Sequence, residues 1–283
     1  MDKGFPRRII CLTEETTETL YLLGEQERIV GVSGYTVRPP EARQKPRVSA
    51  FINAKFDKIL ALEPDLVFAF SDLQAEIAAE LIRRGVTVFT FNQRSIKEIM
   101  EMILVIGRIV GVPETADRLT ATLQREMDAI AESASHFPFR PRVLFEEWYE
   151  PLISGIRWVD ELIEVAGGDS VFPELREQQS AKDRIVNPAE VIARDPQVII
   201  GSWCGRQVKK NLIRAREGWA SISAVRDDRL YEVKSTYILQ PGPAALTEGL
   251  RQLHAILAHA VGHQLDPSLL PKERADARLG LAA

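Results

Sequence analysis

The sequence is poor in the residues that form metal centres and disulfide frameworks. It has 2 cysteines and 4 histidines among 283 residues. Cys11 and Cys204 stand far apart without a CxxC pattern, which argues against a structural zinc site and a disulfide framework. His259 and His263 have the spacing of two ligands on one helix face, but Gly262 beside them favours an exposed helix end. We expect no metal site and no cofactor.

Catalytic signatures are missing too. The chain has no GxSxG, no P-loop, no GxGxxG after its first predicted strand and no HExxH. Glu146 and Glu147 are a candidate acid and base, but adjacent residues of a strand point to opposite faces. Cys204, beside Trp203 and Arg206, is a candidate for a reactive thiolate. We therefore expect a protein that is not an enzyme, with chemistry at these residues as the alternative.

A basic charge and long apolar runs are absent as well. The net charge of −4 argues against nucleic acid as a partner. No segment approaches the run of about 20 apolar residues that a transmembrane helix needs. Residues 1–12 carry charges without an apolar stretch behind them, unlike a signal peptide. Read as written, the chain is expected to be cytoplasmic and not inserted in a membrane; with a leader removed it would be periplasmic or on the cell surface.

The clearest positive signal is a pattern that occurs twice. The stretches Ile59-Leu-Ala-Leu-Glu-Pro-Asp-Leu-Val-Phe-Ala-Phe70 and Val191-Ile-Ala-Arg-Asp-Pro-Gln-Val-Ile-Ile200 each give a helix end, an acid-Pro pair and an apolar run. Proline disfavours the α conformation in the residue before it, so Glu63 and Asp195 are predicted to end their helices. The apolar runs are typical of strands buried on both faces of a parallel sheet. The repeat predicts two similar α/β lobes.

A long helical region separates the two copies. Residues 95–135 are predicted to be helical, with one break at Gly111-Val-Pro113. The second part has apolar residues at three- and four-residue intervals, so one face packs against the protein. We predict an N-terminal α/β lobe over residues 1–112, a connecting helix over 113–137, a C-terminal α/β lobe over 138–262 and a partly disordered tail over 263–283.

Aromatic residues gather where the predicted strands end, although they make up only 7% of the chain. They are Tyr35 and Phe70 in the first half and Trp148, Tyr149, Trp203 and Tyr237 in the second, with Arg206 as the clear cation beside them. Ligands of parallel sheets bind outside the carboxyl ends of the strands. Each residue alone is equally well explained as core. Together they favour two facing walls of a cleft for a large, flat, partly polar small molecule.

The order of these motifs resembles a known family. Gly31-Val-Ser-Gly-Tyr35, the first copy of the repeat and Trp158-Val-Asp-Glu-Leu-Ile-Glu-Val-Ala-Gly-Gly168 are similar, within a match over residues 8–262, to the helical-backbone substrate-binding proteins of ABC importers. The resemblance implies an α/β fold of two Rossmann-like lobes with mainly parallel sheets, one long rigid helix joining them, and a ligand cleft between the lobes. It is strongest to the cobalamin-binding branch, whose ligand-contacting aromatics match Tyr35 and Phe70.

The resemblance also implies a transporter as partner. Exported relatives dock on a permease dimer through one acidic residue on each lobe. Glu76 matches the first, and Glu217 is the candidate for the second, at the end of the mostly basic segment 207–217. Lipid-anchored relatives are attached through a cysteine, whereas Cys11 lies inside the first predicted strand. A relative without the second carboxylate would store, sense or hand over its ligand in the cytosol.

We therefore expect a non-catalytic binding protein for a corrinoid, a ligand like vitamin B12, in ABC-type uptake or intracellular handling. Two alternatives stay open: an iron-siderophore or haem ligand in the same cleft, and a cytosolic enzyme or assembly factor acting on a tetrapyrrole. A siderophore site usually has several cationic side chains, whereas Arg206 is the only clear candidate in these loops. A haem site needs an axial ligand, for which Tyr149 or Tyr237 is available and no histidine is well placed.

Overall fold

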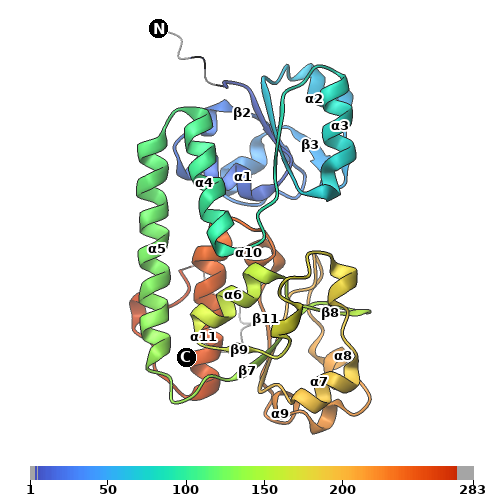
Figure 1. The fold of residues 1–283 in the computed structure, drawn as a ribbon, viewed down its shortest axis with the longest axis vertical. Helices are drawn as coiled ribbons and strands as arrows, with labels where there is room; N and C mark the ends of the chain where they lie inside the picture. The colour runs from blue at the N-terminus through green and yellow to red at the C-terminus, as the bar shows by residue number, and fades with distance from the viewer. Residues whose placement is uncertain (1–3, 5, 273–283) are drawn as a thin grey trace. The chain divides into compact units, whose positions relative to one another are not determined.

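The computed structural model describes residue 4 and residues 6–272, and the chain divides into two compact units. The N-terminal unit contains residues up to Gln93 and Lys97–Leu123, and the C-terminal unit contains Arg94–Ile96 and the chain from Gln124 onward. Each unit has its own sheet with helices around it (Figure 1). The predicted fold, α/β with two lobes and mainly parallel sheets, is confirmed.

The sheet of the N-terminal unit has the strand order β4-β3-β2-β1-β5-β6, with β4 as its antiparallel edge. Its strands are β1 (Ile9–Cys11), β2 (Ile29–Ser33), β3 (Arg47–Ala50), β4 (Asn53–Ala54), β5 (Leu66–Phe70) and β6 (Val88–Phe91). Its helices are α1 (Glu14–Leu22), α2 (Phe56–Ala61), α3 (Ala75–Arg83) and α4 (Ile96–Val110). The apolar run of the first repeat is β5, which is buried along its whole length as predicted.

The sheet of the C-terminal unit has the order β11-β10-β7-β8, and β9 also pairs with β7. Its strands are β7 (Arg142–Tyr149), β8 (Leu152–Ser154), β9 (Asp169–Ser170), β10 (Val198–Gly201) and β11 (Leu230–Glu232). Its helices are α6 (Arg157–Ala166), α7 (Pro188–Arg194), α8 (Lys210–Arg214), α9 (Ser223–Arg226), α10 (Ser235–Ile238) and α11 (Leu250–Val261). Strand β7 continues to Tyr149, and the chain then turns back into β8.

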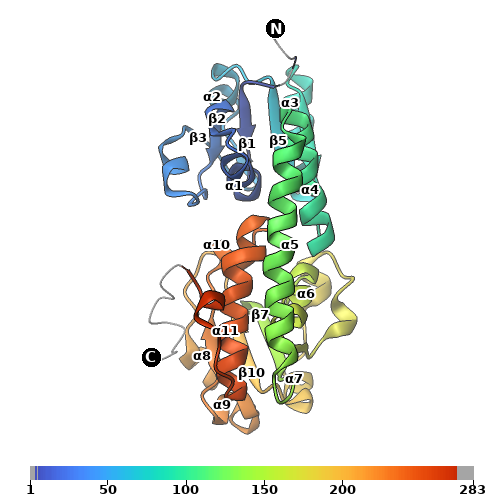
Figure 2. The same ribbon diagram turned by 90° about the vertical axis from the view of Figure 1, so that its left-hand side faces the viewer.

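Helix α5 (Pro113–Ser135) contributes residues to both units. The division between the units falls after Leu123, inside this helix, and the predicted boundaries at 112 and 137 stay predictions. In the C-terminal unit α5 lies beside α11 (Figure 2), where His254 and the hydroxyl of Ser133 are 2.9 Å apart. The chain after α11 is held there too, since Arg251 donates to the carbonyl oxygen of Ser268. Of the predicted disordered tail, residues 273–283 lie outside the described residues.

Both copies of the acid-Pro motif end a helix with the same set of contacts. In the N-terminal unit Glu63, with φ of 46°, follows α2 and precedes the proline. The guanidinium of Arg8 donates from Nε to the carbonyl oxygens of Leu62 and Glu63, at 3.0 Å each. The carboxylate of Asp65 accepts the backbone N–H of Arg8 at 3.0 Å. These bonds tie the end of α2 to the start of β1.

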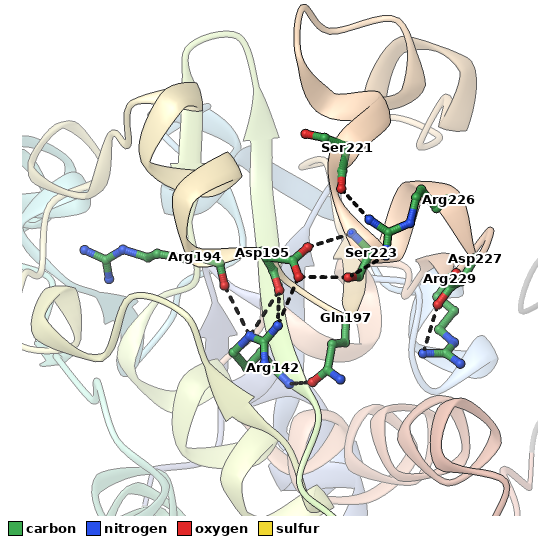
Figure 3. Close-up of polar contacts among 9 residues, drawn as sticks. All are labelled: Arg142, Arg194, Asp195, Gln197, Ser221, Ser223, Arg226, Asp227 and Arg229. Atoms are coloured by element: carbon green, nitrogen blue, oxygen red, sulfur yellow. Dashed lines mark hydrogen bonds and ion pairs between the residues drawn. The ribbon is translucent and has the colours of Figure 1, made fainter.

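The C-terminal unit repeats this arrangement, as Figure 3 shows. Asp195 has φ of 43° at the end of α7. Arg142, the first residue of β7, donates from Nε to the carbonyl oxygens of Arg194 at 3.2 Å and Asp195 at 3.1 Å. The side chain of Gln197 accepts the backbone N–H of Arg142 at 3.1 Å. The last carbonyls of a helix have no partner within it, and in each unit an arginine supplies one. Glu63 and Asp195 end their helices as predicted.

Replacing either capping arginine should destabilise the fold. We expect Arg142→Met or Arg8→Met to lower the free energy of unfolding by about 1–2 kcal/mol, because several carbonyl oxygens lose a charged donor. Urea denaturation of the purified variants measures this change. Arg229→Met is the control: it removes an ion pair with Asp227 at 3.5 Å (Figure 3), and such partly exposed pairs contribute little. Equal losses in all three variants would contradict the capping role.

Candidate functional site

The carboxyl ends of β7 and β10 carry a row of aromatic rings. The two strands are parallel neighbours, so their carboxyl ends lie at one edge of the sheet. The ring of Tyr149, at the end of β7, lies 4.7 Å from the ring of Trp203, which follows β10, and 5.5 Å from that of Trp148. We call these three residues the aromatic row. The guanidinium of Arg206 lies over Trp148 at 5.3 Å, a cation–π contact.

The aromatic row extends from the core to the surface. Trp203 is 2% exposed and belongs to the hydrophobic core of the C-terminal unit. Trp148 and Tyr149 are half-buried, so these two rings are the ones with surface available to a ligand. The indole N–H of Trp148 donates to the carbonyl oxygen of Glu150 at 2.8 Å, which holds the ring over the turn between β7 and β8. The structure thus brings together four of the predicted site residues.

A buried carboxylate lies behind the aromatic row. Glu146 is 0% exposed and accepts the indole N–H of Trp203 at 2.9 Å. Arg216 donates to its two oxygens at 2.7 and 2.9 Å, and also to the backbone carbonyl oxygen of Tyr149 at 3.0 Å. Burial raises the pKa of Glu146, and the bonds and charge of Arg216 oppose that shift. Sequence reasoning named Glu146 only as a candidate catalytic group and missed Arg216.

Glu147 points away from Glu146, as predicted for adjacent residues of a strand. Its carboxylate pairs with the buried guanidinium of Arg184 at 2.6 Å. Each carboxylate of the candidate acid and base pair is therefore bound to an arginine on its own face of β7. Cys204 is exposed, whereas burial raises the pKa of Cys11 to about 12. The Cys11 thiol is thus held in its neutral, unreactive form.

Three further predicted ligand residues lie on other elements. Tyr237 is half-buried on α10. In the N-terminal unit, Tyr35 follows β2 and is 58% exposed, while Phe70, the last residue of β5, is buried. Tyr35 therefore presents most of its ring to solvent, and Phe70 contributes mainly to packing. Their role in ligand binding stays a prediction.

Two buried carboxyl groups at the carboxyl end of β1 were missed by sequence reasoning. Glu14 and Glu15 form the first turn of α1, where a polar run normally indicates an exposed helix start, yet both are buried. The hydroxyl of Thr13 donates to Glu15 at 2.6 Å. Burial raises the pKa of Glu14 to about 7 and that of Glu15 to about 8. The only sequence signal for this cluster was its position directly after the first strand, where α/β proteins place polar sites.

A pocket of about 700 Å³ lies in the C-terminal unit beside the turn between β7 and β8. Its lining is mostly apolar, including Pro151, Leu152 and Ile192, and Tyr149 and Arg216 form part of its wall. Glu217, one of the two predicted docking residues, lines the pocket and is exposed. Glu76, the other, is exposed in the first turn of α3. Both carboxylates are accessible, and their docking role stays a prediction.

The histidines do not assemble into a metal site in the part of the chain that the structure describes. His254 is buried, with Nδ1 bonded to the carbonyl oxygen of Ala166 at 2.9 Å and Nε2 to Ser133 at 2.9 Å. Burial lowers its pKa, so the ring is neutral. Within residues 4 and 6–272, no group of three or more His, Cys, Asp or Glu side chains is arranged to hold a metal ion. Across the same residues, no helix combines the length and apolar character needed to span a bilayer.

The sequence pattern of the periplasmic binding protein family matches residues 9–237, and the chain belongs to this family. It is 26% identical over 263 residues to the ABC transporter substrate-binding lipoprotein YvrC of Bacillus subtilis, covering 89% of this chain and 80% of the relative. It is 28% identical over 249 residues to the vitamin B12-binding protein of Vibrio cholerae serotype O1, covering 86% of this chain and 87% of the relative.

Solved structures agree on the fold. The apo form of the periplasmic heme-binding protein RhuT from Roseiflexus sp. RS-1 superimposes with a TM-score of 0.78 at 24% identity, covering 90% of this chain and 99% of that one. This likeness concerns architecture. The predicted resemblance to substrate-binding proteins of ABC importers is confirmed, and the relatives named above are binding proteins rather than enzymes.

The buried carboxyls near β1 should make stability depend on pH. Folding raises the pKa of Glu14 and Glu15 above their ordinary value of 4.5, so the folded state binds these protons more tightly than the unfolded state. Their contribution is complete below that value and is lost as the pH rises toward about 8. Since one pKa unit corresponds to about 1.4 kcal/mol, the wild type should lose on the order of 2 kcal/mol or more across this range.

The double variant Glu14→Gln/Glu15→Gln should show a flatter dependence on pH when urea denaturation is repeated at each pH. Glu76→Gln, which removes one exposed carboxylate of the same unit, is the control for the change in net charge. A double variant whose stability falls with pH as steeply as the wild type would show that these two groups are not the source.

Proposed function

We propose that this protein is a non-catalytic binding protein for a corrinoid, used in ABC-type uptake or in intracellular handling of that ligand. The aromatic row carries the proposal, because the half-buried rings of Trp148 and Tyr149 lie at the carboxyl ends of parallel strands, where α/β proteins bind ligands. Aromatic faces suit a large, flat macrocycle. The relative from Vibrio cholerae that is named for vitamin B12 supports the choice of ligand.

A haem ligand would need an axial ligand from the protein. His254 does not supply one, because both of its ring nitrogens are engaged inside the C-terminal unit. Tyr149 and Tyr237 are the residues available for that role, and preference for haem over a corrinoid is therefore tested directly by titration.

Calorimetric titration with cyanocobalamin tests the proposal, with haem and a ferric hydroxamate siderophore as parallel ligands. We expect one corrinoid per chain and an affinity that falls by about tenfold or more in Trp148→Ala, because a large aromatic contact is lost. Phe139→Ala is the matched control: this ring is 45% exposed but lies before β7, at the opposite end of the strand.

The control variant should bind as the wild type does. Preferential binding of haem or of the siderophore would keep the binding function and replace the ligand. An equal loss of affinity in both variants would show that the aromatic row is not the binding site. No binding of any of the three would overturn the proposal.

Docking on an ABC permease through Glu76 and Glu217 is the accompanying proposal. Both side chains are exposed, and they lie on different units. The double variant Glu76→Lys/Glu217→Lys should keep the corrinoid affinity of the wild type, since neither residue belongs to the aromatic row. Uptake of labelled ligand by cells that depend on this protein should fall, because the contact with the permease loses two negative charges. Unchanged uptake would exclude these residues as docking points.

A further inference from the structure

The aromatic row is connected to one ion pair, between the fully buried carboxylate of Glu146 and the half-buried guanidinium of Arg216. We propose that these two are positioning residues: they fix the half-buried rings of Trp148 and Tyr149 without contacting the ligand. The inference rests on the proposed function for its effect on affinity, and on geometry alone for its effect on the rings. None of the sequence patterns indicated it, because the partners come from β7 and from the loop after α8.

Two chains of contacts lead from Glu146 to the rings. In the first, its carboxylate accepts the indole N–H of Trp203 at 2.9 Å, and the Trp203 ring packs against Tyr149 at 4.7 Å. In the second, Arg216 holds the carboxylate with two bonds and donates a further one to the backbone carbonyl of Tyr149 at 3.0 Å. The side chain and the backbone of Tyr149 are thus both held in place through the Glu146 carboxylate. Trp148 directly precedes Tyr149 in the chain, so its position is fixed together with that of Tyr149.

The chemistry of the pair suits positioning better than stabilisation. Taking a carboxylate and a guanidinium out of water costs several kcal/mol, and a well-packed apolar pair often serves stability as well or better. A guanidinium bound at two oxygens, however, has a fixed orientation. A cation–π contact also holds the guanidinium of Arg216, which lies over the ring of the buried Trp219 at 4.4 Å. The arrangement gives the row a defined geometry.

The neighbouring pair on the same strand provides a matched comparison. Glu147 and Arg184 also form an ion pair with one buried member, but on the opposite face of β7, where Arg184 donates to the carbonyl oxygen of Ser154. Glu146→Gln and Glu147→Gln each remove one charge from one such pair. A purely structural role for Glu146 predicts the same consequences for both variants.

We expect Glu146→Gln to weaken corrinoid binding by about tenfold, because the charged hydrogen bonds that orient Arg216 are lost. Glu147→Gln should bind within about twofold of the wild type, even if its stability falls as much. Calorimetry gives the affinities, and urea denaturation gives the stabilities. An affinity unchanged in Glu146→Gln, or lowered equally in both variants, would overturn the proposal.

Near-ultraviolet circular dichroism supplies a readout that needs no ligand. Three of the 4 tryptophans, Trp148, Trp203 and Trp219, belong to this network, so the spectrum reports mainly on it. The spectrum should change in Glu146→Gln and stay that of the wild type in Glu147→Gln. If the wild type binds no corrinoid, the proposed function fails, and this comparison still decides on positioning: an unchanged spectrum in Glu146→Gln overturns it.

Arg216→Lys provides a second variant if Glu146→Gln does not fold. Lysine keeps a cation beside the buried carboxylate but lacks the planar fork that reaches both Glu146 and the carbonyl of Tyr149. The altered spectrum and the weaker binding are expected here too. A folded Arg216→Lys protein with the spectrum and affinity of the wild type would show that orientation by the guanidinium is not required.

Discussion

In each unit, hydrogen bonds from an arginine guanidinium to the last carbonyl oxygens of a helix hold the helix end against the start of a strand. Arg8 and Arg142 each stand where the first strand of a unit begins, and each closes the helix that leads into the next parallel strand. An acid in a left-handed conformation and a proline shape the exit. Because helix end and strand start are fixed together, the parallel strands begin in register and present their carboxyl ends at one edge.

Strand β7 connects this cap to the site. The first residue of β7, Arg142, caps the end of α7. In the middle of β7, Glu146 and Glu147 bind arginines on opposite faces of the strand. The last two residues of β7 belong to the aromatic row. The strand therefore joins the cap directly to the rings of the proposed ligand site. Such a preformed wall suits a protein that captures a rigid ligand, because little ordering is needed on binding.

The sequence predicted the elements whose signals are local. The apolar runs Leu66–Phe70 and Val198–Gly201 are strands, and the helical region breaks at Gly111-Val-Pro113, because period, length and proline act over a few residues. It missed what depends on distant partners. Glu146 interrupts an apolar run and was predicted only as a candidate acid or base, because its partner Arg216 lies 70 residues further along the chain. Glu14 and Glu15 are buried, although charged residues in the first turn of a helix are usually exposed. Burial of a charge is decided by tertiary structure.

The same limit applies to the candidate site. Aromatic residues after the strands could be found from composition, and Trp148, Tyr149 and Trp203 do come together, but their exposure differs and only packing determines it. The half-buried rings of Trp148 and Tyr149 are proposed to hold a corrinoid. A crystal structure of the protein grown with cyanocobalamin tests it most directly: the account predicts the macrocycle in contact with Trp148 and Tyr149, and a corrinoid bound away from both rings would contradict it.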